Sequence, residues 1–324
     1  MSATATTATT TKLTADTWPI GAATLMFGGT TADGRDVTTA GPSAWRGPFA
    51  EIAAAGFTEV DVTSSFIRIG DLDAGGRSDL SAALEEFGLT ISTVPVARRS
   101  ILDPDPDRAA ANLDFALDTV RAAAQLGIST VCLGLHQPLT PAQEAAHWFW
   151  LAQGEENPDD PAVWAQAVDG FATIGAEAGR LGVQISLEMY EGTYLGTSES
   201  SVRLVLDIGL ANVGLCPDIG NIVRLHREVE DWRTMLERML PHTNYWQLKN
   251  YLRDHDPATG AWFSAPAPLE SGFIDYRTAI GMALEAGFTG PMCVEHYGGD
   301  GLSVSAANRD YIRRIIRAKR EGPR

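Results

Sequence analysis

Four oxygen-bearing side chains lie near the ends of apolar segments in the second half of the chain. Glu188 lies in "ISLEMY", Asp218 in "GLCPDIGN", Gln247 in "NYWQLKN" and Glu295 in "MCVEHY". Each acidic residue alone could be a solvated loop residue, a helix cap or half of a salt bridge. If all four side chains converge, however, the carboxylates cannot all stay ionised without a cation among them. An all-oxygen set predicts a hard divalent metal, first Mn²⁺, with Mg²⁺ and Co²⁺ as alternatives, because zinc usually recruits His or Cys.

A repeated pattern predicts the elements that position these residues. An Ala-rich amphipathic segment ends in Gly plus an apolar residue, and a short β-rich run follows; this occurs six times, as in "AQLGISTVCLGL" and "GRLGVQISLEMY". Glycine commonly terminates a helix because it adopts positive φ without strain. With "WPIGAATLMF" and "HTNYWQLKNY", the expected strands number eight. Eight buried strands alternating with helices predict an α/β fold, a (β/α)8 TIM barrel.

An open doubly wound sheet is the alternative fold. It is disfavoured because "MFGGTTADG" after the first strand lacks the spacing of a dinucleotide-binding motif. In a barrel, the four polar residues share the rim at the carboxyl ends of the strands, where barrel enzymes carry their chemistry. Strand alternation directs Ser186, Cys216, Tyr245 and Cys293 inward, into the layer beneath them. The segment "RDHDPATGAWF" is interpreted as a solvated loop.

Length and composition limit the possible domain organisation, partners and location of the protein. We expect residues 1–17, which are rich in Thr and Ala, to form a flexible tail, and residues 18–324 to form one barrel domain. The 41 acidic against 25 basic residues argue against nucleic acid or an anionic membrane as partner. Three cysteines in apolar segments do not form a disulfide framework, and no segment resembles a signal peptide or membrane span. A cytoplasmic location is therefore expected.

The order of the four residues, with "LESGFIDYRTAI" before the last strand, resembles the xylose isomerase-like superfamily of sugar isomerases and epimerases. The resemblance extends from about Trp18 onward. It implies that the family's Glu, Asp, His and Glu ligands correspond to Glu188, Asp218, Gln247 and Glu295. Two positions depart from the family: Gln247 replaces the usual histidine, and Asn221 stands where a second histidine is common. Ordinary ketose epimerases use the first and last Glu as a proton-transferring pair.

A long insertion at about 136–160 follows the fourth strand, with "LGLHQPLTP" leading into "AAHWFWLAQGEENPDD". Its Trp148 and Trp150 are predicted substrate contacts, since aromatic faces suit sugars and flat aglycones. With Gln247, this loop resembles the α subunit of the C-glycoside deglycosidases. That resemblance implies cleavage of the carbon–carbon bond of a 3-oxo-C-glycoside and a small β subunit as partner chain.

The resulting hypothesis is a metal-dependent carbon–carbon lyase acting on a glycoside. A metal on the sugar carbonyl would acidify the neighbouring C–H, and a base would remove that proton. His147 is the predicted base because imidazole titrates near neutral pH, and His136 at the strand end is its rival. Lys249 is predicted to bind a sugar oxygen or to hold a metal-ligand carboxylate, with an exposed loop lysine as the alternative. Asn221 is predicted to hydrogen-bond the substrate or the Asp218 loop.

Two other functions remain open at the level of sequence. The superfamily scaffold fits a ketose isomerase or 3-epimerase. The missing histidine ligand fits a non-catalytic barrel that serves as a binding or assembly subunit. Turnover of ketoses distinguishes the first from the lyase, and metal content distinguishes the second from both enzymes.

Overall fold

The computed structural model describes residues 13–320 and 322, in which eight parallel strands form a nearly closed barrel. Neighbouring strands follow the order β6-β5-β4-β3-β2-β1-β10-β7, and a parallel bridge from Leu215 to Thr243 links the two ends. The strands are β1 (Ile20–Ala23), β2 (Glu59–Asp61), β3 (Thr90–Pro95), β4 (Thr130–Leu133), β5 (Gln184–Glu188), β6 (Val213–Cys216), β7 (Trp246–Leu248) and β10 (Met292–Val294). The predicted (β/α)8 barrel is confirmed, with all eight strands at the predicted segments.

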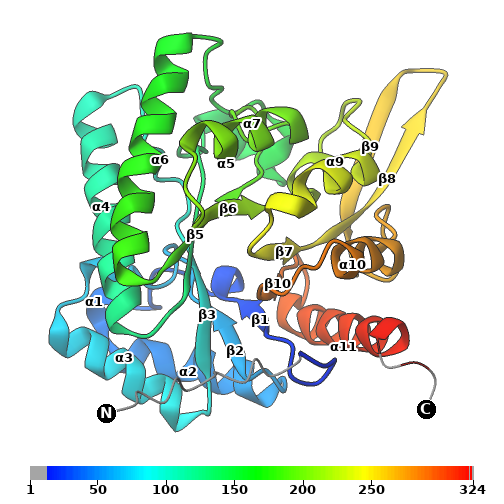
Figure 1. The fold of residues 1–324 in the computed structure, drawn as a ribbon. Helices are drawn as coiled ribbons and strands as arrows, with labels where there is room; N and C mark the ends of the chain where they lie inside the picture. The colour runs from blue at the N-terminus through cyan, green and yellow to red at the C-terminus, as the bar shows by residue number, and fades with distance from the viewer. Residues whose placement is uncertain (1–12, 321, 323–324) are drawn as a thin grey trace, which may run out of the picture.

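Helices surround the strands, as Figure 1 shows. The longer ones are α2 (Pro42–Ala54), α3 (Ala74–Glu86), α4 (Pro106–Gln125), α6 (Pro161–Leu181), α7 (Ser198–Ile208), α9 (Trp232–Met239), α10 (Tyr276–Glu285) and α11 (Gly301–Arg320). Shorter ones lie in connections: α1 (Val37–Ala40), α5 (Pro141–Ala145), α8 (Gly220–Val223) and the 3-10 turns η1 (Thr24–Met26), η2 (Ile69–Asp71), η3 (Phe149–Leu151) and η4 (Leu240–His242). No described helix has the length and apolarity that crossing a bilayer requires.

The helix boundaries follow from local chemistry. Asp160 begins α6 by accepting a hydrogen bond from the backbone N–H of Ala162, and Pro161 occupies the first helical position, where a missing N–H is tolerated. Gly182 ends α6 with φ of 75°. The same positive φ occurs at each of the six glycines of the sequence pattern: Gly56, Gly88, Gly127, Gly182, Gly209 and Gly287. The six glycines in the sequence pattern therefore mark the helix ends correctly.

The packed chain begins before the predicted domain start. Of the predicted tail, residues 1–12 lie outside the described residues, whereas residues 13–17 pack against α11. Ala15 is fully buried, and Arg313 of α11 donates hydrogen bonds to the backbone carbonyls of Ala15 and Asp16. The C-terminal helix thus holds this segment through its arginines.

The segment interpreted as a loop around His255 forms a projecting antiparallel hairpin, so that interpretation was wrong. Strand β8 (Asn250–Asp256) pairs with β9 (Ala261–Ala267) in a separate two-stranded sheet. Figure 1 shows the hairpin extending away from the barrel beside α9. Its inner face is anchored by Arg253, whose guanidinium donates to three backbone carbonyls of the α8 region: Val223, Leu225 and Arg227.

Candidate active site

The four predicted ligand residues lie at the same end of the barrel. Glu188 is the last residue of β5, Asp218 follows β6, Gln247 is central in β7 and Glu295 follows β10. Asp218, Gln247 and Glu295 are at most 5% exposed, and Glu188 is partly exposed. Because parallel strands all end at one rim, four neighbouring strands deliver these side chains to one region.

Lys249 and Asn221 join the three carboxylates into one network. The ammonium of Lys249 lies 2.5 Å from Asp218 Oδ2 and 2.8 Å from Glu295 Oε2. The amide of Asn221 donates to Glu188 Oε1 at 3.0 Å and to Asp218 Oδ2 at 3.1 Å. Every carboxylate of the set therefore has a donor from this chain, and Lys249 is its internal counter-ion.

Gln247 faces the layer below the carboxylates. Its side-chain carbonyl accepts a weak hydrogen bond from the Cys216 thiol at 3.6 Å. Cys216, Tyr245 and Cys293 belong to one buried cluster inside the barrel, together with Cys132 and Ala23. The predicted inward direction of these three residues is confirmed.

The donor chemistry of the cluster suits a hard cation. All its ligating atoms are oxygens, and Asp218 Oδ1 is buried without a hydrogen-bond partner. Yet the described residues contain no group of three or more His, Cys, Asp or Glu arranged to hold a metal, and the Lys249 ammonium lies between two of the carboxylates. The residues fit a divalent ion once Lys249 moves aside, and the four-ligand set stays a prediction.

The two glutamates differ in their electrostatic surroundings. Burial, followed by the nearby charge of Asp218, raises the pKa of Glu188 to about 8. Glu295 instead forms an ion pair with Lys249. Burial lowers the pKa of Lys249, but the carboxylates of Asp218 and Glu295 outweigh it and hold this pKa well above its usual value. Without a bound cation, the surroundings of Glu188 therefore favour its protonated form, and Lys249 stays charged.

A fourth acidic residue, Asp61 of β2, lies fully buried inside the barrel. Ser92 Oγ donates to its Oδ1 at 2.5 Å, and the hydroxyl of Tyr245 donates to Oδ2. Burial raises the pKa of Asp61 to about 7. Sequence reasoning missed this residue, although an aspartate inside the apolar segment "TEVDVT" was the available signal.

Asp61→Asn is expected to stabilise the protein increasingly as the pH rises. The folded-state pKa lies above the unfolded value of 3.8, so the unfolded chain loses the proton first and wild-type stability falls between about pH 4 and pH 7. The asparagine cannot titrate. The free energy of unfolding of the variant, relative to wild type, should rise by up to about 3 kcal/mol between pH 5 and pH 8. Urea unfolding at both pH values measures this, and a pH-independent difference would contradict it.

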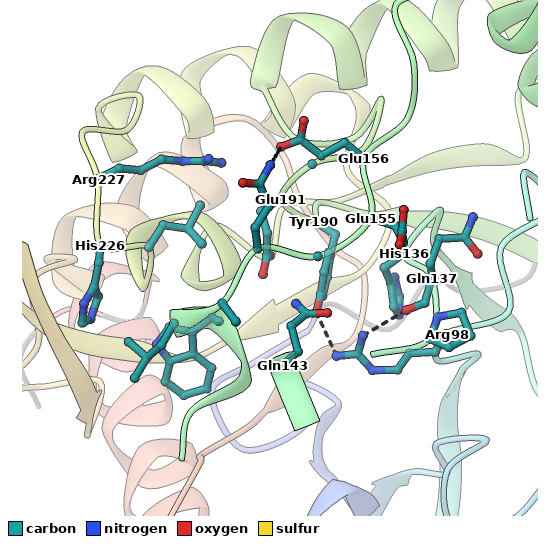
Figure 2. Close-up of a pocket in the computed structure, with 18 residues that line it drawn as sticks. Arg98, His136, Gln137, Gln143, Glu155, Glu156, Tyr190, Glu191, His226 and Arg227 are labelled. Carbon is teal, nitrogen blue, oxygen red and sulfur yellow. Dashed lines mark hydrogen bonds between the residues drawn. The ribbon is translucent and has the colours of Figure 1, made fainter. Parts of the chain in front are cut away.

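A cavity of about 180 Å³ opens over the ends of β4 and β5, and none of the four predicted ligand residues lines it. Figure 2 shows its wall, with Arg98, His136, Gln137 and Tyr190 among the lining residues. His136 stacks on Tyr190 with ring centroids 4.4 Å apart. Burial, and then the charges of Arg98, Arg224 and Lys249, lower the pKa of His136 well below its usual value. His136 is thus a neutral imidazole in the cavity wall.

The insertion at 136–160 covers the barrel mouth with aromatic rings. Trp150 is buried and lines the cavity, and Trp148 stacks on it at 5.0 Å. Trp150 also contacts Tyr251 and Tyr297, each at 5.5 Å. Through these contacts, the loop that follows β4 packs against the segment after β10.

The two histidines of the insertion occupy different places. His147 is exposed, packs edge-on against Trp148 at 4.5 Å, and is not among the residues that line the cavity. His136 lines it. The roles predicted for both histidines, and those of Trp148, Trp150, Lys249 and Asn221 toward a substrate, remain predictions.

Arg224 is a site residue that the sequence did not reveal. It follows α8, is fully buried, and donates from Nη2 to both carboxylate oxygens of Glu191 at 3.0 and 2.9 Å. Its guanidinium lies over the rings of Phe149, Trp150 and Tyr190 at 4.8 to 5.2 Å. An arginine in "NIVRLHREVE" gives no signal of burial, because its partners come from distant segments.

Two comparisons place this architecture among known proteins, and a third finds no match. A family model described as xylose isomerase-like TIM barrel matches residues 49–318. The crystal structure of a xylose isomerase-like TIM barrel protein from Mycobacterium smegmatis in complex with magnesium is 40% identical, with a TM-score of 0.90, and the match covers 95% of this chain and 99% of that chain. The comparison with curated proteins finds no match.

More distant solved structures share the fold. L-ribulose 3-epimerase is 16% identical with a TM-score of 0.68, covering 94% of this chain and 96% of that chain. D-psicose 3-epimerase, solved in the presence of D-fructose, is 15% identical with a TM-score of 0.63, covering 94% and 100%. At these identities the likeness concerns the fold alone. The family model and the 40% identical relative together establish that this chain belongs to the xylose isomerase-like TIM barrel family.

Proposed function

We propose that the protein is an enzyme that transfers a proton at the carbon next to the carbonyl of a sugar, as a ketose isomerase or 3-epimerase. The observation that carries this proposal is the pair Glu188 and Glu295, two carboxyl groups at one barrel mouth that Asn221, Asp218 and Lys249 join into one network. Two carboxyl groups held at one site can serve as the acid and the base of a proton transfer. The epimerase neighbours, which share the fold, are compatible with this class of reaction.

In the proposed reaction, Glu295 is the base. Its carboxylate, which pairs with the ammonium of Lys249 at 2.8 Å, accepts the proton from the carbon next to the carbonyl and leaves an enediolate. Glu188, in its protonated form, returns a proton to the opposite face of the same carbon in an epimerase, or to the neighbouring carbon in an isomerase. Asn221 holds Glu188 in place through the hydrogen bond to Oε1.

A divalent cation would contribute the remaining electrostatic stabilisation. Glu188, Asp218 and Glu295, with Gln247 as fourth ligand, are the residues that would hold it, and the magnesium complex of the relative from Mycobacterium smegmatis supports this. When bound, the ion would polarise the carbonyl oxygen of the substrate. We propose Mg²⁺ or Mn²⁺, since both accept an all-oxygen ligand set.

The test is turnover of simple ketoses. Purified protein with Mn²⁺ or Mg²⁺, incubated in D₂O with a panel of ketopentoses and ketohexoses, should interconvert at least one pair and place deuterium at the carbon that loses its proton, as followed by NMR. Absence of both interconversion and exchange across the panel would contradict the proposal.

A second candidate is the lyase that cleaves 3-oxo-C-glycosides. The observation that favours it is the stacked pair Trp148 and Trp150 over the barrel mouth, which could receive a flat aglycone. This candidate includes a small β subunit as partner chain. Co-expression with such a subunit and assay on a 3-oxo-C-glucoside should release free aglycone, and the release should vanish in His147→Ala if that residue is the base. Failure of both assays, with no binding of divalent ions, would leave the non-catalytic barrel.

A further inference from the structure

Two arginines from distant parts of the chain share one pair of aromatic rings behind the cavity. The guanidinium of Arg98 lies 4.9 Å from the ring centre of Phe149 and 5.7 Å from that of Tyr190. Arg224 lies over the same rings at 4.8 and 5.2 Å. Two like charges that share the same pair of rings repel each other, and an anion near them reduces that repulsion.

The chain supplies one carboxylate for these two cations within the described residues. Glu191 pairs with Arg224. Arg98 donates to neutral acceptors, the carbonyl of Gln137 at 3.1 Å and the hydroxyl of Tyr190 at 3.0 Å, and Figure 2 shows both bonds. The group of three therefore carries a net charge of +1 at the inner wall, in a chain whose formal net charge is −16.

Several donors around this wall are unmatched in the described structure. Arg224 Nε and Nη1 and Trp150 Nε1 are buried donors without a hydrogen-bond partner, and His136 Nδ1 is buried without a partner as well. A buried donor left unpaired costs about 1–3 kcal/mol. The oxygens of a ligand in the cavity would pair with those that line it, and would reduce the repulsion between the arginines.

The backbone conformation at Arg98 also supports a ligand site at this wall. Its φ of 54° is the only positive φ at a non-glycine residue among the described residues. A side chain held in this region costs about 1–3 kcal/mol, and such strain gathers at sites that clamp ligands. Two hydrogen bonds hold Arg98 in this conformation, one to the carbonyl of Gln137 and one to the hydroxyl of Tyr190.

Two further glutamates line the cavity but lie at its outer edge. Glu155 and Glu156 are exposed, and Gln153 donates to Glu156 at 3.1 Å. Charges in water are screened over about 8–10 Å, whereas charges in the interior act strongly. The depressed pKa of His136, to which Arg98, Arg224 and Lys249 all contribute after burial, agrees with a positive inner wall.

We propose that this cavity binds the carboxylate of an acidic sugar, so that the substrate is a uronate or aldonate type of sugar rather than a neutral one. The carboxylate lies beside Arg98, and Arg224, oriented by Glu191, adds charge from behind Trp150 and Tyr190. The volume of about 180 Å³ is below the range of about 300–1,000 Å³ that drug-sized ligands occupy and suits a small molecule. The proposal rests on the proposed sugar-processing function and specifies its substrate class.

The experiment compares three probes that differ only at one end of the sugar: D-glucuronate, D-glucose and D-glucose 6-phosphate. Calorimetry on the full-length protein should give about 10- to 100-fold tighter binding of glucuronate than of glucose, since a charge-assisted hydrogen bond contributes about 1.5–3 kcal/mol. The preference should weaken with added salt. Arg98→Gln should abolish it. Arg99→Gln is the matched control, because Arg99 carries the same charge but packs over Phe115 and does not line the cavity.

Each outcome decides between the alternatives. Equal or tighter binding of glucose, no binding of glucuronate, or a preference that survives Arg98→Gln overturns the inference. Tightest binding of glucose 6-phosphate also overturns it, in favour of a phosphate ligand. If neutral ketoses are turned over while glucuronate is not preferred, the proposed function stands and this inference fails. If glucuronate binds as expected but no sugar is interconverted, the binding site stands and the proposed function fails.

Discussion

Replacing Glu295 with glutamine is expected to lower kcat by about 10²–10⁴-fold, the contribution of a positioned general base or acid. The amide keeps the size of the side chain but cannot accept a proton from carbon. Glu188→Gln should lower kcat by a similar factor, because the amide cannot deliver a proton to the enediolate. Measurements of kcat and KM on the ketose that the wild type converts best will test both variants.

Exchange with solvent separates the two roles. In D₂O, Glu188→Gln should still incorporate deuterium into the substrate without forming product, since Glu295 removes the proton before Glu188 acts. Glu295→Gln should neither incorporate deuterium nor form product. Glu285→Gln is the matched control: Glu285 is exposed at the end of α10, and its activity should equal that of the wild type. Full activity in both active-site variants would exclude the proton-transferring pair.

The barrel could be predicted because its signals are local. Each Gly that ends a helix acts through its own φ, and each buried strand is a short apolar run, so "GRLGVQISLEMY" specifies one helix end and one strand without knowledge of the rest. The positions of Glu188 and Glu295 at strand ends follow from the same pattern. The polar rim was therefore predicted residue by residue.

The partners of those rim residues could be predicted only in part, because they come from contacts between distant segments. Lys249 was predicted to bind a sugar oxygen or to hold a metal-ligand carboxylate; the carboxylate contact is confirmed, but the spacing of β6, β7 and β10 that brings its ammonium between two carboxylates is not visible in the sequence. Arg224 meets Phe149 and Glu191 in the same way. The β8–β9 hairpin was missed because "RDHDPATGAWF" is polar and lacks the alternation that marks a half-buried strand.

Lys249→Met is expected to destabilise the metal-free protein by about 3–5 kcal/mol, because it leaves Asp218 and Glu295 buried without their cation. Methionine keeps most of the length of the side chain and removes only the charge. The same change removes the group that competes with a divalent ion for these oxygens. Mg²⁺ should therefore raise the Tm of the variant more than that of the wild type, since saturation at 100 times Kd stabilises a protein by about 2.7 kcal/mol.

Calorimetry and thermal unfolding, each with and without MgCl₂, measure this exchange of one cation for another without any assay of activity. The affinity for Mg²⁺ should be at least about tenfold higher in Lys249→Met, a gain of about 1.4 kcal/mol. Lys319→Met is the matched control, since Lys319 lies exposed near the end of α11 and should leave both quantities unchanged. If Lys249→Met and the wild type respond equally to Mg²⁺, the ammonium and the metal do not share a site. A larger response in the variant means that Lys249 keeps the carboxylates assembled until the ion displaces it.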